Sequence, residues 1–217
     1  MLNLLATVFI AASVVGVGQA PPPRRSAMGP ETALLVIDIQ NFYFENGSLP
    51  LTGSVEAARQ ARRVLDLFRE RKLPVVHIRH ASKTTAFVDG EPVDPQYKIR
   101  DEVAPAPGEK VITKHYANSF RDTELLDYLR GRKIASLVIV GMQTHMCVEA
   151  AARAATDLGF VVTVVSDACA TRPLTYGGKT APADMVHTAA LAAINGTYGR
   201  VVGIEAWLAE SAPTAAR

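Results

Sequence analysis

The chain has 217 residues, of which 48% are hydrophobic and 20% charged, and its formal net charge is +2. This length and composition favour one globular α/β domain with a sizeable core. A net charge this small, without a concentrated Lys/Arg cluster, argues against a nucleic-acid partner. The two cysteines, Cys147 and Cys169, are too few for a disulfide framework.

The N-terminal segment differs from the rest of the chain. Residues 2–18 are uncharged and mainly apolar, and the small residues at 18–20 are spaced like a signal-peptidase site. Polar residues interrupt the run, so it is weak for a membrane span. No Lys or Arg precedes it, which leaves the match to an export signal incomplete. We expect residues 1–27 to be a signal peptide or a disordered extension before a single domain at 28–217. The protein would be exported if residues 1–20 are a signal peptide, and cytoplasmic if translation starts at Met28.

The first predicted elements are a strand, a loop and a helix. Residues 33–39 are an apolar run that carries Asp38 near its C-terminal end. A run without polar alternation is typical of a strand covered on both faces, and open α/β sheets place ligand sites at such strand ends. The loop that follows contains Gln40 and three aromatic residues at 42–44, which could line a pocket. A helix is predicted over 54–72, with a serine as its N-cap.

The next predicted strand, 74–80, carries two histidines. His77 and His80 are three residues apart, so on a strand they point to opposite faces. One of them could line the site, but the spacing does not favour a shared metal ion. Residues 81–108 are rich in proline and charge, which predicts an irregular excursion over the end of the sheet. A short strand over 110–114 follows.

The stretch 135–159 is predicted to form a buried strand, a sharp turn and a helix. Four apolar residues at 137–140 indicate the strand, which Gly141 closes. The helix begins almost at Cys147, and Gly159 ends it. A cysteine in the first helical turn faces free N–H groups and the positive end of the helix dipole, which favour the nucleophilic thiolate. Those N–H groups could also hold an oxyanion, although an inert buried cysteine is the alternative.

The remaining elements complete an alternating order. A helix that Gly131 ends precedes the stretch 135–159, and a strand over 160–165, a helix over 183–194 and a last strand over 200–204 follow it. This alternation predicts an α/β fold with a doubly wound, mainly parallel sheet of about six strands and helices on both faces.

Asp38, Lys114 and Cys147 each fall at or just beyond the C-terminal end of a predicted strand. In a doubly wound sheet these ends form a common edge, so residues distant in sequence can converge there. Asp38 could take the thiol proton and return it to a leaving group, while Lys114 could hold the thiolate and orient the carboxylate. Taken singly, Asp38 could be a turn former and Lys114 a solvated strand end.

From residue 32 to residue 202 the chain resembles the isochorismatase-like cysteine hydrolases. The resemblance is carried by LLVIDIQNFYF, by VITKHYANSF, and by VIVGMQTHMCVEAAARAATDLGF followed by VVSDACAT. It implies that Asp38, Lys114 and Cys147 form a catalytic triad.

The resemblance also implies details of the turn before the cysteine. The peptide bond between Met142 and Gln143 should be cis, and the Gln143 and Cys147 amides should form an oxyanion hole. Isochorismatases proper have no cysteine at the nucleophile position, so Cys147 argues against that substrate. Nicotinamidases carry an Asp-x-His metal site after the second strand, where this chain has His-Ala-Ser-Lys at 80–83. We therefore expect neither a metal ion nor another cofactor.

What remains is hydrolysis of a C–N bond in a small amide, ureido or carbamoyl compound through an acyl-thioester. The expected partners are this small substrate and further copies of the chain in a homodimer or homotetramer, with no nucleic acid and no stable membrane span in the mature form. The residues predicted to contact substrate are Gln40, Phe44, Tyr116, Phe120 and His145.

Two other functions stay open at this point. A non-catalytic binding protein could keep the fold without turnover, although the intact triad argues against it. A thiol redox protein could pair Cys147 with Cys169, but neither lies in a Cys-x-x-Cys motif.

Overall fold

The computed structural model describes residues 28–212, so the export signal predicted at 1–20 lies outside the described residues. Its centre is a six-stranded sheet in the order β10-β7-β6-β1-β2-β5, and all neighbouring strands pair in parallel. This confirms the predicted doubly wound parallel sheet. The strands of this sheet are β1 (Thr32–Ile37), β2 (Val75–His80), β5 (Lys110–Lys114), β6 (Ser136–Met142), β7 (Val161–Ala170) and β10 (Arg200–Val202).

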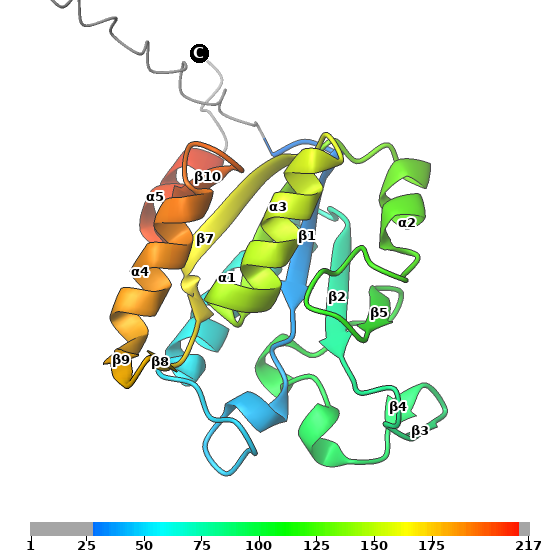
Figure 1. Ribbon diagram of the computed structural model, residues 1–217. Coiled ribbons are helices and arrows are strands. Elements are labelled where there is room, and N and C mark those ends of the chain that lie inside the picture. Colours follow the sequence, from blue (N-terminus) through cyan, green and yellow to red (C-terminus); the bar gives the residue numbers. More distant parts are fainter. Residues whose placement is uncertain (1–27, 213–217) are drawn as a thin grey trace, which may run out of the picture.

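Helices cover both faces of the sheet. In residues 28–212 these are α1 (Ser54–Glu70), α2 (Leu125–Gly131), α3 (Glu149–Asp157), α4 (Ala183–Ile194) and α5 (Ile204–Ser211). The α1 and α5 helices pack on one face and α2, α3 and α4 on the other (Figure 1). The result is three layers with a hydrophobic core on each side of the sheet.

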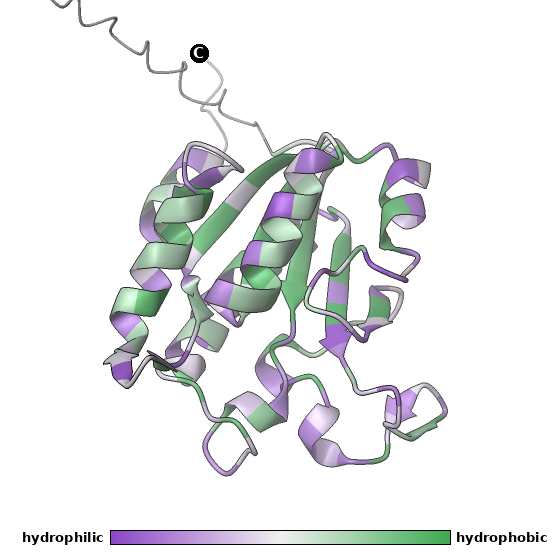
Figure 2. Ribbon diagram, viewed as in Figure 1, coloured by the Kyte–Doolittle hydropathy of each residue, from purple (hydrophilic) through white to green (hydrophobic). Residues whose placement is uncertain are grey.

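Strand β1 shows why an unbroken apolar run forms a central strand. Leu34 and Val36 belong to the core under α1, whereas Ala33, Leu35 and Ile37 belong to the core under α3. Successive side chains of a strand point to opposite faces, so both faces must be apolar when both are covered. Figure 2 shows these strands as a mainly green layer between helices with mixed colouring.

Three parts of the chain differ from the predicted elements. The strand predicted to end at Val165 continues to Ala170, because β7 bulges where its register against β6 shifts. The strand predicted over 200–204 ends at Val202, and an unpredicted helix, α5, begins at Ile204. This helix places Trp207 parallel to the ring of Phe68 on α1, with ring centroids 6.3 Å apart.

Short elements occupy the loops at the ends of the strands. Two small antiparallel hairpins pair β3 (Phe87–Val88) with β4 (Glu91–Pro92) and β8 (Leu174–Tyr176) with β9 (Lys179–Ala181). Three single 3-10 turns are η1 (Asn41–Tyr43), η2 (Pro95–Tyr97) and η3 (Asp101–Val103). The predicted excursion over 81–108 therefore contains one hairpin and two of these turns. No helix within residues 28–212 has the length and apolar character needed to cross a bilayer.

Strands β1 and β6 approach each other closely where both end. Gly141 has φ +134°, and a Cβ at this position would lie 2.0 Å from the carbonyl oxygen of Ile37. Only glycine allows both this backbone conformation and this approach. The peptide bond between Met142 and Gln143 is cis, as the family resemblance implies. The two strands thus deliver their C-terminal residues to one place at the edge of the sheet.

Candidate active site

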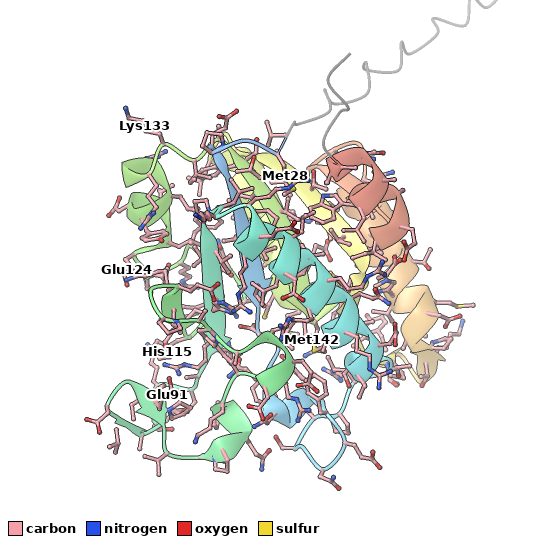
Figure 3. All side chains as sticks on the ribbon, turned by 180° about the vertical axis from the view of Figure 1, so that it is seen from behind. Met28, Glu91, His115, Glu124, Lys133 and Met142 are labelled. Atoms are coloured by element: carbon pink, nitrogen blue, oxygen red, sulfur yellow. The ribbon has the colours of Figure 1, made fainter. Side chains whose placement is uncertain are left out.

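The fold brings Asp38, Lys114 and Cys147 together at the C-terminal edge of the sheet. Asp38 directly follows β1, Lys114 is the last residue of β5, and Cys147 lies in the π-helical turn η4 (Thr144–Val148) after β6. Lys114 Nζ lies 2.6 Å from Asp38 Oδ2 and 3.3 Å from Cys147 Sγ. All three side chains are buried. Figure 3 shows Met142 and His115, which lie at this edge, at the same level and far from Met28 and Lys133.

The electrostatics of this cluster favour a neutral sulfur at rest. Burial and the neighbouring carboxylate of Asp38 raise the pKa of the Cys147 thiol to about 12, although Lys114 opposes this change. Burial alone would lower the pKa of Lys114, but the charges and hydrogen bonds of Asp38 and Cys147 together outweigh burial, and the pKa is raised. The resting cluster is therefore a carboxylate, an ammonium and a thiol. The expectation that the helix terminus favours a resting thiolate is wrong, because the sulfur is buried beside an anion.

The turn that carries Cys147 is π-helical and so wider than the α-helix start that was predicted. The amides of Met146 and Val148 both donate to the carbonyl oxygen of Gln143, and α3 begins only at Glu149. Among the described residues, the amide of Gln143 donates to no backbone acceptor, and the amide of Cys147 donates to none outside the η4 turn itself. Both N–H groups lie in the segment that carries the sulfur.

A cavity of about 320 Å³ opens beside the sulfur. It is lined by Phe42, Tyr43, Ser48, Leu49, His80, Tyr97, Ala117, Gln143, Met146, Cys147 and Arg172. Its volume suits a small molecule. Apolar and aromatic side chains form most of the wall, and the polar groups gather around Cys147.

One side of this cavity is a fixed polar chain. Arg172 Nε donates to Gln143 Oε1 at 3.1 Å, and Gln143 Nε2 donates to the hydroxyl of Tyr43 at 3.2 Å. The terminal nitrogens of Arg172 make no hydrogen bond or ion pair within residues 28–212. Arg172 therefore presents an unpaired cation to the cavity next to Gln143.

Two of the predicted substrate-contacting residues have structural contacts. Gln40 is buried, its Nε2 donates to the carbonyl oxygens of His80 and Tyr97, and its Oε1 accepts from the amide of His80. Phe44 is buried beneath the guanidinium of Arg100, which lies 4.5 Å from the ring centroid. Neither residue is among those that line the cavity.

The other three predicted contact residues also lie outside this cavity. Tyr116 lies beneath two cationic side chains. Phe120 stacks on Phe160, with ring centroids 6.1 Å apart. His145 Nδ1 lies 2.5 Å from Thr171 Oγ1, and its ring borders a separate groove along α4. Contact of these residues with substrate stays a prediction that the geometry of the empty cavity does not favour.

Several lining residues escaped the sequence analysis. Arg172 lies two residues beyond β7, but the predicted strand ended at Val165, which placed the arginine far from the edge of the sheet. Of the two strand histidines, one of which was expected to line the site, it is His80 that does so, and it ends its strand just as Lys114 does. Met146 next to the cysteine, and Tyr97 and Ala117 in loops, carried no such signal, because loop conformation decides their direction.

The two histidines of β2 contact different groups, as their spacing predicts. His77 Nε2 lies 2.8 Å from a carboxylate oxygen of Glu109, and His80 Nδ1 lies 3.4 Å from Lys114 Nζ. Within the described part of the chain, no three His, Cys, Asp or Glu side chains are arranged to hold a metal ion.

Comparison with known proteins places this fold and site in a class. Residues 32–206 match the model of the isochorismatase domain. The chain belongs to the isochorismatase family.

Two relatives and one solved structure cover 66% to 82% of this chain. The isochorismatase family protein YddQ of Bacillus subtilis is 43% identical over 82% of this chain and 98% of its own. Maleamate amidohydrolase of Pseudomonas putida is 32% identical over 66% of this chain and 74% of its own. The crystal structure of a protein described as an isochorismatase hydrolase from Oleispira antarctica superposes with a TM-score of 0.75. It is 44% identical and covers 82% of this chain and 96% of its own.

Proposed function

We propose that the protein is a cysteine hydrolase that cleaves the C–N bond of a small amide, ureido or carbamoyl compound. The observation that carries this proposal is the buried ammonium of Lys114, which lies between a carboxylate and a thiol beside a small cavity. Similarity to maleamate amidohydrolase supports the reaction class.

The first half of the proposed reaction forms an acyl-thioester. Asp38 Oδ1 is buried and has no hydrogen-bond partner among the described residues, so it is free to accept the thiol proton. As the proton leaves, Sγ of Cys147 attacks the carbonyl carbon, and the amides of Gln143 and Cys147 hold the resulting oxyanion. Asp38 then returns the proton to the nitrogen, the C–N bond breaks, and the amine or ammonia departs.

The second half releases the acid. Asp38 takes a proton from a water molecule, whose oxygen attacks the thioester carbon while the same two amides hold the oxyanion. The C–S bond breaks, the sulfur recovers its proton from Asp38, and the carboxylic acid leaves. Lys114 stays an ammonium throughout, orients the carboxylate and stabilises negative charge on the sulfur.

Arg172 indicates the charge of the substrate. It is the one cation among the residues that line the cavity, histidine aside, and its terminal nitrogens are unpaired in the described structure. A guanidinium binds a carboxylate through two parallel hydrogen bonds. We therefore propose that the part of the substrate remote from the C–N bond carries a carboxylate.

The test is ammonia release from a panel of small amides and ureides. The panel includes maleamate and maleamide. Both carry the amide to be cleaved, but the second group is a carboxylate in maleamate and a neutral amide in maleamide. Wild type is expected to release ammonia and to prefer the acid amide, whereas Cys147→Ala should release none. Arg172→Gln should lose the preference and keep activity on neutral amides. Binding without turnover by wild type would overturn the hydrolase proposal, and equal turnover of the two compounds would overturn the role of Arg172.

We also propose that the protein forms a homodimer, or a homotetramer built from such dimers. A groove of about 840 Å³ follows α4 and the β8–β9 hairpin, and α4 shows green colouring on its outward side in Figure 2. Tyr176 and Met185 beside it are 92% and 63% exposed. A helix that is apolar all round is usually covered. Light scattering should give a multiple of the monomer mass, and Met185→Glu should reduce it. A monomeric wild type would contradict this proposal.

Export is a further proposal and rests on the composition of residues 2–18 alone. Expression of the full gene, followed by N-terminal sequencing, should give a mature chain that begins at or near Pro21. A chain that begins at Met28 would instead indicate a cytoplasmic protein.

A further inference from the structure

His80 lies where β2 ends beside the active site. It pairs in register with Lys114 on the neighbouring strand β5, and its Nδ1 lies 3.4 Å from Lys114 Nζ. Its backbone is held from the other side, because Gln40 accepts from its amide at 2.8 Å and donates to its carbonyl oxygen at 2.9 Å. The ring lines the cavity beside Cys147. The position of this imidazole is therefore fixed on both sides.

The ammonium of Lys114 determines which ring nitrogen carries the proton. An ammonium has three donor hydrogens and no acceptor. Its three polar neighbours among the described residues are Asp38 Oδ2, Cys147 Sγ and His80 Nδ1. Since the nitrogen that faces a donor must accept, Nδ1 of His80 is unprotonated and its single proton lies on Nε2.

The surroundings also keep this ring neutral. Burial lowers the pKa of His80, and the positive charge of Lys114 and the neighbouring His115 act in the same direction, while the carboxylate of Asp38 acts against them. The charged and titratable groups that face the ring are these three. The net change is downward, so His80 is a neutral imidazole at pH 7.

We propose that His80 is a substrate-binding residue that donates its Nε2–H to an acceptor atom of the substrate on the β2 side of the scissile bond. This inference rests on the proposed hydrolase function and adds a second recognition point to it. No acceptor for Nε2 exists among the described residues, and the ring borders the cavity. The substrate is thereby expected to present a carbonyl, ureido or carboxylate oxygen to β2, opposite the side where Arg172 lies.

The tautomer is tested without any substrate. In full-length protein with 15N-labelled histidine, the imidazole shifts of His80 at pH 7.5 should show Nδ1 unprotonated and Nε2 protonated. In Lys114→Met this preference should weaken, because the donor that faces Nδ1 is gone. A proton on Nδ1 in wild type, or a charged ring at pH 7.5, would overturn the proposal even if the enzyme hydrolyses amides.

Two substitutions separate the two ends of the ring. His80→Gln places an amide N–H near the position of Nε2, whereas His80→Asn places an amide oxygen near Nδ1 and leaves no donor for the substrate. With the best amide from the panel, His80→Asn should raise KM about 3- to 10-fold, the effect of one lost hydrogen bond. His80→Gln should keep KM near wild type. Equal KM values for wild type and His80→Asn would contradict substrate binding by Nε2.

His115→Asn is the matched control. His115 Nδ1 bonds to the carbonyl oxygen of Ala81 and does not line the cavity, so its replacement should leave KM unchanged. If wild type hydrolyses no member of the panel, the hydrolase proposal fails by itself, and the imidazole shifts still decide the tautomer of His80.

The pH dependence of kcat/KM also distinguishes a substrate-binding histidine from a purely structural one, which would not affect it. Protonation at Nδ1 keeps the Nε2–H donor but sets a second positive charge against the Lys114 ammonium and displaces the ring, so kcat/KM should fall on an acid limb centred below the ordinary histidine value of about 6.5. In His80→Gln this limb should disappear. An unchanged acid limb in that variant would show that another group causes it.

Discussion

Strand β2 carries the buried His77 near its N-terminal end and the half-buried His80 at its C-terminal end, and the polar clusters around the two rings differ. At the N-terminal end, His77 contacts Glu109, whose two carboxylate oxygens also accept from Arg69 on α1 at 2.8 Å each and from the amide of Ala106. At the C-terminal end, His80 contacts Lys114, and the carboxylate of Asp38 keeps one oxygen unpaired in the described structure.

This difference separates a structural cluster from a reactive one. Every oxygen of Glu109 is used, so the cluster fastens the loop before β5 to α1, and the atom it leaves unpaired in the described structure, Nδ1 of His77, does not face the cavity. The cluster at the other end holds an unpaired carboxylate oxygen and a thiol beside the cavity. Buried polar groups without partners are costly, and such sites persist where a ligand completes them. Substitutions in each cluster test whether the two ends of β2 differ in function.

The largest effect is expected from Asp38→Asn. Loss of the general base should reduce kcat about 10²- to 10⁴-fold. The ammonium of Lys114 would then be buried without a counter-ion, which should cost about 3–5 kcal/mol of unfolding free energy. Adding Lys114→Met should recover much of the stability without restoring activity. Urea unfolding and steady-state rates measure both quantities, and an Asp38→Asn enzyme with wild-type turnover would contradict the proposed mechanism.

Glu109→Gln is expected to have the opposite pattern. The variant keeps the shape of the side chain but loses its charged bonds with Arg69 and its acceptor for His77, so unfolding free energy should fall by about 1–3 kcal/mol. The catalytic constants of the folded enzyme should stay at wild-type values, because the cluster does not reach the cavity. A large fall in kcat with unchanged stability would show that the two ends of β2 are coupled.

Acid should weaken the structural cluster through both of its titrating members. Burial alone would raise the pKa of Glu109, but bonds from Arg69, Ala106 and His77 lower it to about 2. Burial lowers the pKa of His77, although Glu109 opposes this. Both folded-state pKa values are lower than in the unfolded chain, so their stabilisation is present at neutral pH. It is lost as pH falls below the unfolded values, first for His77 near 6.5 and then for Glu109 near 4.5. Urea midpoints should keep falling below pH 4.5 in wild type, where Glu109 becomes protonated, and should fall less steeply there in Glu109→Gln.

The smallest expected effect concerns the two thiols. Burial raises the pKa of Cys169 to about 12 as well, and its Sγ contacts the carbonyl oxygen of Val165 inside the core. Iodoacetamide should label Cys147 faster because the cavity reaches it, yet more slowly at pH 7 than a free cysteine because the thiol is neutral. Mass spectrometry of timed samples gives both rates. Faster labelling of Cys169 would contradict the site, and labelling of Cys147 faster than free cysteine would contradict its neutral resting state.

The central sheet and the chemical groups of the site could be predicted from the sequence more accurately than the residues around the site. The apolar runs at 34–37 and 137–140 predicted buried strands because a central strand needs apolar residues on both faces. The continuation of β7 past Val165 was missed because Ser166 and Asp167 interrupt the apolar run while the backbone still pairs with β6 beyond the bulge. The helix α5 was missed because it is only eight residues long and follows directly on a strand.

The finer properties of the site depend on tertiary contacts that no local pattern encodes. The direction of Phe44 and Phe120 is set by what they pack against, and neither faces the cavity. The pKa of Cys147 follows from its burial beside Asp38, a residue more than a hundred positions away, which outweighs the helix terminus. Arg172 could have been placed at the site only if the full length of β7 had been known.

The bulge in β7 has a consequence for how this enzyme can diversify. Between the pairs Ile139↔Val164 and Gly141↔Cys169, β6 advances two residues while β7 advances five. The extra residues sit outside the ladder, so gain or loss of one there alters where Arg172 emerges and leaves Asp38, Lys114 and Cys147 where β1, β5 and β6 place them. If Arg172 sets the preference for charged substrates, as proposed, a change in the length of β7 can alter that preference without moving Asp38, Lys114 or Cys147.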